Sequence, residues 1–340
     1  MYIIIAILLF GLLIFIHELG HYITARIFNV AITEFSIGMG PKLSSKTSKK
    51  TGIAYSIRFL PIGGFVSMVG EDEESDDENA FHKKPIWQRI IVSAAGSASN
   101  ILLGFLVMLI LVASTKTLGT VQISAFTEGA TSNTLLQVDD IIKEVDGYNV
   151  HVANELSYFI SRYGNEPVDI TVERNGEETV LNDVVFPTTV QSGVLFGMTD
   201  FKVYPAEKNF GTNVKNGFFQ AILTIRTVFD SLFDLVTGTY GVEDLSGPVG
   251  VVKVISTSAK TNSYQLWYIF VLLAMNLGIM NMLPFPALDG GRILMLLVEL
   301  VIRRPVNKKV EGYINLVGMI ILFAFMAFIT VKDIFQLIKK

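Results

Sequence analysis

Four segments of this chain are long and apolar enough to cross a lipid bilayer, and they restrict the folds open to it. The hydrocarbon core of a bilayer is about 30 Å thick, and a helix needs about 20 predominantly apolar residues to span it. Charged residues make up 17% of the chain, whereas soluble globular domains carry about 25%. We therefore predict a polytopic α-helical membrane protein with four transmembrane helices. The segments are residues 2–25, 90–113, 266–283 with a continuation to 302, and 313–331.

The third apolar segment is interrupted by the sequence NMLPFPALDGG at residues 281–291. Pro284 and Pro286 remove backbone donors and prevent a regular helix there. Irregular backbone at membrane depth is tolerated only where it is buried in protein or lies beside water. We therefore expect a protein-lined, water-accessible point within the membrane at this break.

The first apolar segment carries the sequence HELGH, which contains His17, Glu18 and His21. Residues four apart lie on one face of a helix, so the two imidazoles can hold one ion. In zinc proteases with this spacing, the intervening glutamate acts as general base on the attacking water. A catalytic zinc site takes three protein ligands and leaves the fourth position open. We predict a Zn²⁺ site with Glu18 as the base. The alternative is two histidines satisfied by hydrogen bonds between helices.

The third ligand must be a histidine or a carboxylate, because the chain contains no cysteine. Asp289 is the best candidate, since it lies at the break in the third segment. Its alternative role is to cap the helix that begins near Gly290. Glu299 lies two or three turns further along and is a poorer candidate. His82 and His151 occupy polar segments without ligand-like spacing, so we expect surface roles for both.

The residues between the apolar segments include β-like sequence. Residues 26–89 hold two short stretches that favour a hairpin or sheet dipping toward the bilayer. Residues 117–187 alternate short strands around one helix-like stretch, as in a small, partly open β-barrel. Residues 213–236 combine apolar side chains at helical spacing with interrupting charges, which predicts an amphipathic helix at the membrane interface. A helix packed on the soluble domain is the alternative.

Charge indicates both orientation and partners. The loops RRPVNKK at 303–309 and FHKKPIWQR at 81–89 are rich in cations, and positive loops favour the cytoplasm. The domain at 117–187 is then expected to be extracytoplasmic. The net charge of −4 provides no basic face for a phosphate backbone, so nucleic acid is not expected as a partner. The N-terminus lacks a positive region and a small-residue cleavage site, and we expect it to be retained.

Several motifs together resemble the bacterial site-2 protease family, which consists of intramembrane zinc metalloproteases of the type that cleave anti-sigma factors. These motifs are HELGH, MNLGIMNMLPFPALDGGR, FSIGMGPKL, YSIRFLPIGGFV and LSGPVGVVKVIS, and they run almost from end to end of the chain. The resemblance implies that His17, His21 and Asp289 bind zinc, that Glu18 activates water, and that Asn276 and Asn281 help to hold the substrate backbone.

The same resemblance implies a domain organisation. Residues 1–116 hold the first two spans, 117–187 resemble a single PDZ domain, 188–265 form a linker with the interfacial helix, and 266–340 hold the last two spans. Residues 31–69 correspond to a membrane-reentrant β element that presents an unwound substrate. Two departures stand out. The family's Gly-Pro-x-x-Asn motif reads GSASN, which keeps Gly96 and Asn100 but loses the proline, and the usual Gly-Asp of the PDZ-like part reads Asp139-Asp140.

From the resemblance we expect a multi-pass protein of the bacterial cytoplasmic membrane with its active site toward the cytoplasmic side. Its expected substrates are single-span membrane proteins, such as anti-sigma factors or signal-peptide remnants, cut within their transmembrane segments. One alternative is a non-catalytic, metal-stabilised membrane scaffold with a PDZ-like binding domain. A metal or proton transporter is a third class, but transporters usually show internal repeats and this sequence has none.

Overall fold

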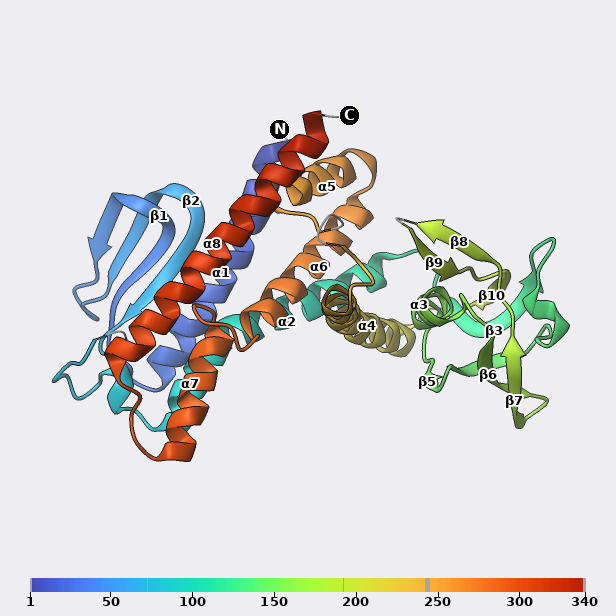
Figure 1. Cartoon of the computed structure of the whole chain (residues 1–340), viewed down its shortest axis with the longest axis horizontal. Helices are drawn as coiled ribbons and strands as arrows, with labels where there is room; N and C mark the ends of the chain where they lie inside the picture. Colours follow the sequence, from blue (N-terminus) through green and yellow to red (C-terminus); the bar gives the residue numbers. More distant parts are fainter. Residues whose placement is uncertain (1, 72, 192, 242–244, 339–340) are drawn as a thin grey trace. The chain divides into compact units, whose positions relative to one another are not determined.

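The computed structural model of the chain describes residues 2–71, 73–191, 193–241 and 245–338 (Figure 1). The chain divides into two compact units, one formed by residues 1–104 and 245–340 and the other by residues 105–244. Among the described residues, four helices are long and apolar enough to cross a membrane, which confirms the four predicted segments. These stretches are Ile3–Ile27, Ile86–Ser114, Ser263–Asn281 and Lys308–Gln336.

The first unit is mainly helical. Helix α5 contacts α1, α6 and α8, and its start is capped by α8, because the carboxylate of Asp333 accepts a hydrogen bond from the Gly250 amide at 2.7 Å. A carboxylate at the positive end of a helix stabilises that helix. The helices are α1 (Tyr2–Ile27), α2 (Ile86–Ser114), α5 (Pro248–Thr261), α6 (Ser263–Asn281), α7 (Asp289–Ile302) and α8 (Lys308–Ile338), with a short 3₁₀ turn at Phe81–Lys83.

The predicted break in the third apolar segment separates α6 from α7. Helix α6 ends at Asn281, and α7 begins at Asp289. The first turn of α7 folds back on the end of α6 so closely that a Cβ atom at Gly290 would lie 2.2 Å from the Met282 carbonyl oxygen. Glycine is therefore required at this position. The irregular segment thus places Asp289 at the first position of a helix.

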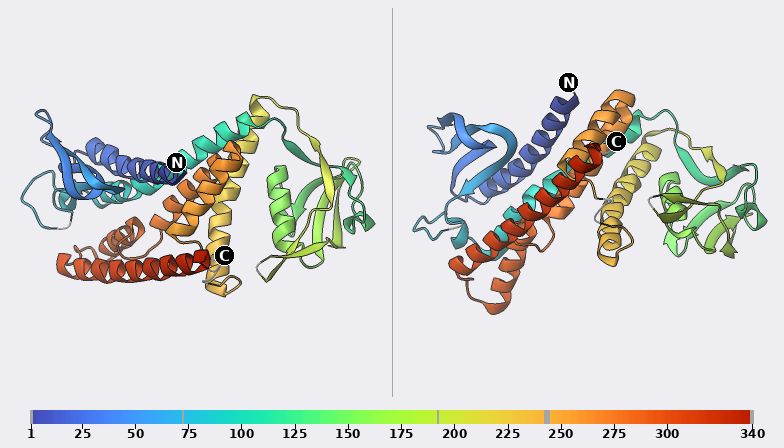
Figure 2. Two further views of the ribbon diagram at one scale, coloured as in Figure 1. Left: turned by 90° about the horizontal axis from the view of Figure 1, so that it is seen from above. Right: turned by 45° about the horizontal axis from the view of Figure 1, so that its top comes forward.

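Two long strands, β1 (Ile32–Thr47) and β2 (Ala54–Met68), pair antiparallel and lie along α1 (Figures 1 and 2). Both strands bend, so residues 34–37 have partners on two sides: residues 64–67 and residues 54–57. Residues 44–47 pair with the other side of residues 54–57. In the described part of the chain, residues 64–67 have no strand partner on their other side, so this stretch forms an open edge of the sheet.

A polar network ties the stretches of this sheet together. Burial alone would raise the pKa of Glu34, but hydrogen bonds from Ser56, Lys42 and Arg58 outweigh it and lower the pKa to about 2. The carboxylate accepts from Lys42 Nζ and from Arg58 Nη2, both at 2.9 Å. The Arg58 guanidinium also lies 4.8 Å from the centre of the Phe65 ring. These contacts therefore join separate stretches of β1 and β2 through their side chains.

The second unit contains an antiparallel sheet in the order β10-β3-β4-β6-β7, with β5 beside β4. Its core is apolar and includes Ile123, Ile142, Ile160 and Ile170. Strand β10 pairs with β3, so the sheet continues beyond residue 187, where the sequence suggested that the linker begins. The strands are β3 (Gly119–Phe126), β4 (Ile141–Val145), β5 (Tyr148–Asn149), β6 (Val168–Arg174), β7 (Glu177–Val184), β8 (Thr188–Gln191), β9 (Val194–Gly197) and β10 (Phe201–Pro205).

Two helices accompany this sheet, α3 (Ala153–Tyr163) and α4 (Phe210–Thr237). Arg162 on α3 binds the buried Asp234 of α4 through two hydrogen bonds of 2.7 and 2.9 Å. The hydroxyl group of Tyr158 donates to Asp230 at 2.6 Å. One side of α4 is therefore packed on the β-rich domain, as in the alternative considered above. The exposed apolar residues of α4 include Phe218, Ile222, Phe229 and Phe233, and their placement at a membrane surface stays a prediction.

The Asp139-Asp140 pair has a clear role in the β-rich domain. Asp139 adopts a left-handed conformation with a φ of 75°. The side chain of Asp140 is 1% exposed and binds Arg174 through two hydrogen bonds, at 2.7 Å to Nε and 2.8 Å to Nη2. It also accepts from the Gln137 amide at 2.8 Å. Asp140 thus links the turn before β4 to strand β6.

We expect Asp140→Ala to destabilise this domain by about 2 kcal/mol, because it removes charge-assisted hydrogen bonds from a buried site. Amide hydrogen exchange in β4 and β6 of the full-length protein would measure the loss. Glu178→Ala, on the exposed face of β7, is the matched control and should change protection by less than about 0.5 kcal/mol. Equal protection in both variants would contradict the assigned role.

Candidate metal centre

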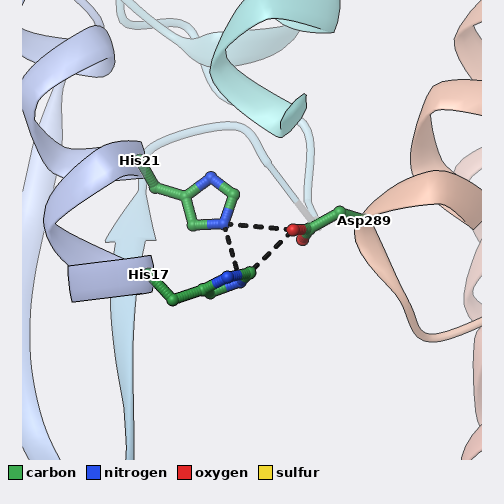
Figure 3. A group of neighbouring side chains, drawn as sticks. All are labelled: His17, His21 and Asp289. Atoms are coloured by element: carbon green, nitrogen blue, oxygen red, sulfur yellow. Dashed lines mark hydrogen bonds and ion pairs between the residues drawn. The ribbon is translucent and has the colours of Figure 1, made fainter. Parts of the chain in front are cut away.

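Three side chains from two distant parts of the chain converge at one point (Figure 3). Helix α1 presents His17 and His21 one turn apart, with their Nε2 atoms 3.3 Å from each other. The Oδ2 atom of Asp289, at the start of α7, lies 3.2 Å from His17 Nε2 and 3.4 Å from His21 Nε2. The two histidines are 8% and 9% exposed. The three atoms therefore form a nearly equilateral triangle inside the protein.

This triangle has the dimensions of a zinc site. In tetrahedral coordination with bonds of about 2.0–2.1 Å, the ligand atoms lie about 3.3–3.4 Å apart. An ion centred just outside the plane of the triangle can contact all three atoms and keep a fourth position free. Two imidazoles and one carboxylate also form a donor set that suits zinc. The residues present thus fit the metal in both number and spacing.

Helix α2 provides hydrogen-bonding groups behind both imidazoles. The Nδ1 atom of His21 lies 2.8 Å from the Val92 carbonyl oxygen, so this nitrogen carries the proton and Nε2 keeps its lone pair for a metal. His17 Nδ1 lies 3.5 Å from the amide group of Asn100, which is fully buried. The Asn100 Oδ1 atom has no partner among the described residues. Exchanging the amide nitrogen and oxygen would let Oδ1 accept the His17 proton and satisfy both groups.

Gly96 makes this close approach between α1 and α2 possible. A Cβ atom at Gly96 would lie 2.3 Å from His21 Nε2 and 2.8 Å from His17 Nε2. Ser93, Gly96, Ser97 and Asn100 follow one another at helical spacing and lie on one face of α2. These four small or polar residues therefore form a stripe that faces the metal site, on a helix that is otherwise apolar.

A cavity of about 160 Å³ adjoins the three ligand atoms. Glu18 lines it next to His17, and its Cγ atom would lie 3.1 Å from a Cβ atom at Gly64. Phe65, Val66 and Met68 of β2 also line it. A carboxylate, a metal-sized triangle and a strand edge without a strand partner among the described residues thus surround one space. The space is large enough for several water molecules at about 30 Å³ each.

The other candidate ligands lie elsewhere. Glu299 forms an ion pair with Arg89 of α2, with Oε2 3.1 Å from Nη1. His82 Nδ1 lies 3.2 Å from the Gly70 carbonyl oxygen, and the His151 ring stacks on Phe219 with a centroid separation of 3.9 Å. None of these three belongs to the His/His/Asp group.

Asn276 and Asn281 are partly exposed on α6. Neither lines the cavity described above.

Two residues close to the site were not identified from the sequence. Ser97 is fully buried, and its hydroxyl group donates to Asp289 Oδ2 at 3.0 Å. Ser93 lines the cavity, and its Oγ atom has no partner among the described residues. The available signal was the spacing of small and polar residues in the second apolar segment, which matches one face of a helix.

Comparison with known proteins gives a consistent result. The model of Peptidase family M50 matches residues 5–325. A protein of Fusobacterium nucleatum named as a zinc metalloprotease is 36% identical over 98% of this chain and 98% of its own length. One of Clostridium perfringens with the same kind of name is 32% identical, with 98% of each chain covered. The Regulator of sigma-W protease RasP of Bacillus subtilis is 28% identical, with 97% of each chain covered.

The alignment with the Bacillus subtilis protein extends over 415 positions, which is more than the 340 residues of this chain. That relative therefore carries inserted residues that have no counterpart here.

We expect Gly96→Ala to lower zinc affinity at least about tenfold, because the new methyl group would displace both imidazoles, and changes behind metal ligands typically cost 10–100-fold. Helix propensity cannot cause the loss, since alanine favours a helix more than glycine does. Gly312→Ala is the control, because a Cβ atom there would meet nothing within 4 Å. Zinc competition with a chromophoric chelator would measure both variants, and wild-type affinity for Gly96→Ala would contradict the geometry.

Proposed function

Because the chain belongs to peptidase family M50, the site-2 proteases, we propose that it cuts single-span membrane proteins within their transmembrane segments. The protein is a zinc metalloendopeptidase with several membrane helices. The observation that carries the proposal is the His/His/Asp triangle, with the Glu18 carboxylate beside it, on helices that are otherwise apolar. Anti-sigma factors and signal-peptide remnants are the proposed substrate classes, and one relative is named a regulator of sigma-W.

In this mechanism His17, His21 and Asp289 hold the ion. Bound Zn²⁺ supplies a Lewis acid that polarises the scissile carbonyl group and makes water a better nucleophile. Glu18 takes a proton from the attacking water and passes it to the leaving nitrogen, the role of a general base that then becomes an acid. Its position in the cavity wall, one residue after His17, suits this transfer. The surrounding helices keep the cavity separate from lipid.

A substrate helix must open before it can be cut, because each of its peptide groups is held in a hydrogen bond between residues i and i−4. An exposed backbone group in lipid is costly. We propose that the opened segment pairs with residues 64–67 of β2, which have no strand partner on their outer side among the described residues and border the cavity. Strand addition would satisfy the freed backbone and hold one carbonyl group near the ion. Asn276 and Asn281 are proposed to bind the same backbone.

We base the proposed sidedness of the protein on its charged loops. The cationic loops at 81–89 and 303–309 are proposed to face the cytoplasm, with the active site toward that side. The β-rich domain, which we regard as PDZ-like, then lies outside the cytoplasm. A metal-stabilised scaffold would need the three ligands but not a carboxylate beside them. Glu18 and the open edge of β2 therefore favour the protease.

We expect Glu18→Gln to retain zinc at one ion per chain and to lower the cleavage rate by about 10²–10⁴-fold, because the amide cannot accept a proton. The assay is cleavage of a purified single-span anti-sigma factor, trimmed to its membrane segment, in detergent. His21→Ala is the reference variant and should lose both zinc and cleavage. A Glu18→Gln protein that binds zinc and cuts at the wild-type rate would support the scaffold or an unknown base instead.

We expect Val66→Pro to lower cleavage at least about tenfold with unchanged zinc content, because proline removes an amide donor from the open edge. Val66→Ala keeps the amide donor and should cleave within about threefold of the wild type. Lys49→Pro, in the turn between β1 and β2, is the proline control and should also remain active. Strand addition would have to be abandoned if Val66→Pro cleaved as fast as these two variants.

A further inference from the structure

Ser97 makes an unusual contact for a serine inside an apolar helix. Its side chain is fully buried, and its hydroxyl group donates to Asp289 Oδ2 at 3.0 Å. Serine in a helix commonly bonds the carbonyl oxygen one turn back, as Ser99 does with Ala95 at 2.7 Å. Ser97 instead reaches across to another helix. The oxygen that it contacts is the same one that faces both imidazoles.

The surroundings of Ser97 hold it in this position. A Cβ atom at Gly278 of α6 would lie 2.8 Å from the Ser97 carbonyl oxygen, so α6 packs directly on this turn of α2. Two to three turns from the Ser97–Asp289 contact, Arg89 of α2 also binds Glu299 of α7 through two hydrogen bonds. The Ser97–Asp289 and Arg89–Glu299 contacts together fix the rotation and the register of α7 against α2. The carboxylate of Asp289 is therefore delivered to Ser97 by the packing of three helices.

The contact with Asp289 is made by the side chain of Ser97 and not by its backbone. The hydroxyl group adds a donor without adding a charge. A carboxylate oxygen has two lone pairs, so one can accept from Ser97 while the other faces the imidazoles. A carboxylate without such a partner would be free to rotate away from the triangle.

We propose that Ser97 is a positioning residue that orients Asp289 for zinc binding. The inference depends on the zinc-protease function proposed above, because it concerns the same three ligands. The hydroxyl group fixes one carboxylate oxygen at 3.0 Å and thereby directs the second lone pair toward the two Nε2 atoms. Partners of this kind behind a metal ligand typically change metal affinity by 10–100-fold.

The test compares Ser97→Ala with Ser99→Ala, which removes an identical hydroxyl group from the same turn of α2 without touching a ligand. Zinc affinity is measured by chelator competition on the full-length protein in detergent, and thermal unfolding is measured on the metal-free forms. We expect Ser97→Ala to bind zinc about 10–100-fold more weakly than Ser99→Ala, with equal unfolding temperatures. The visible absorption of the Co²⁺-loaded protein should change in Ser97→Ala alone, because it reports ligand geometry.

Equal zinc affinity in the two serine variants would overturn the inference and leave the protease proposal intact. A weaker affinity that accompanies a lower unfolding temperature of metal-free Ser97→Ala would also overturn it, since the serine would then be structural. A wild-type protein that binds no zinc would refute the proposed function itself, and this inference with it.

Discussion

Polar groups inside apolar helices stabilise this protein only because they satisfy one another. An unpaired charge or imidazole in a lipid-facing helix costs several kcal/mol. His17 and His21 of α1 meet Asp289 of α7, and α2 supplies Val92, Asn100 and Ser97 behind them. Each polar group therefore depends on helices other than its own. The requirement to satisfy these groups holds α1, α2 and α7 in one arrangement, and that arrangement is the site.

Close packing makes the arrangement possible. Gly96 leaves room for both imidazoles, and Gly290 lets α7 begin directly behind the end of α6. The same break provides a carboxylate at the first position of a helix. The open edge of β2 borders the resulting cavity. The candidate ligands, the proposed base and the strand edge thus share one small space, although they come from three separate parts of the chain.

Features governed by local sequence could be predicted, and features governed by distant contacts could not. Lengths of apolar sequence gave the four spans, Pro284 and Pro286 indicated the break, and the i, i+4 spacing paired His17 with His21. The contact of Ser97 with Asp289 depends on which faces of α2 and α7 meet, and a single sequence does not contain that information. The pairing of β10 with β3 and the packing of α4 on α3 likewise join residues far apart in the chain.

The separation of the ligands along the chain has a consequence for biosynthesis. The two histidines of α1 emerge from the ribosome before Asp289, which follows only after the β-rich domain and α6 have been made. A partly synthesised chain thus holds only two of the three ligands, whatever its length before α7. If zinc binding requires all three residues, as proposed, the site can form only after the start of α7 has been synthesised.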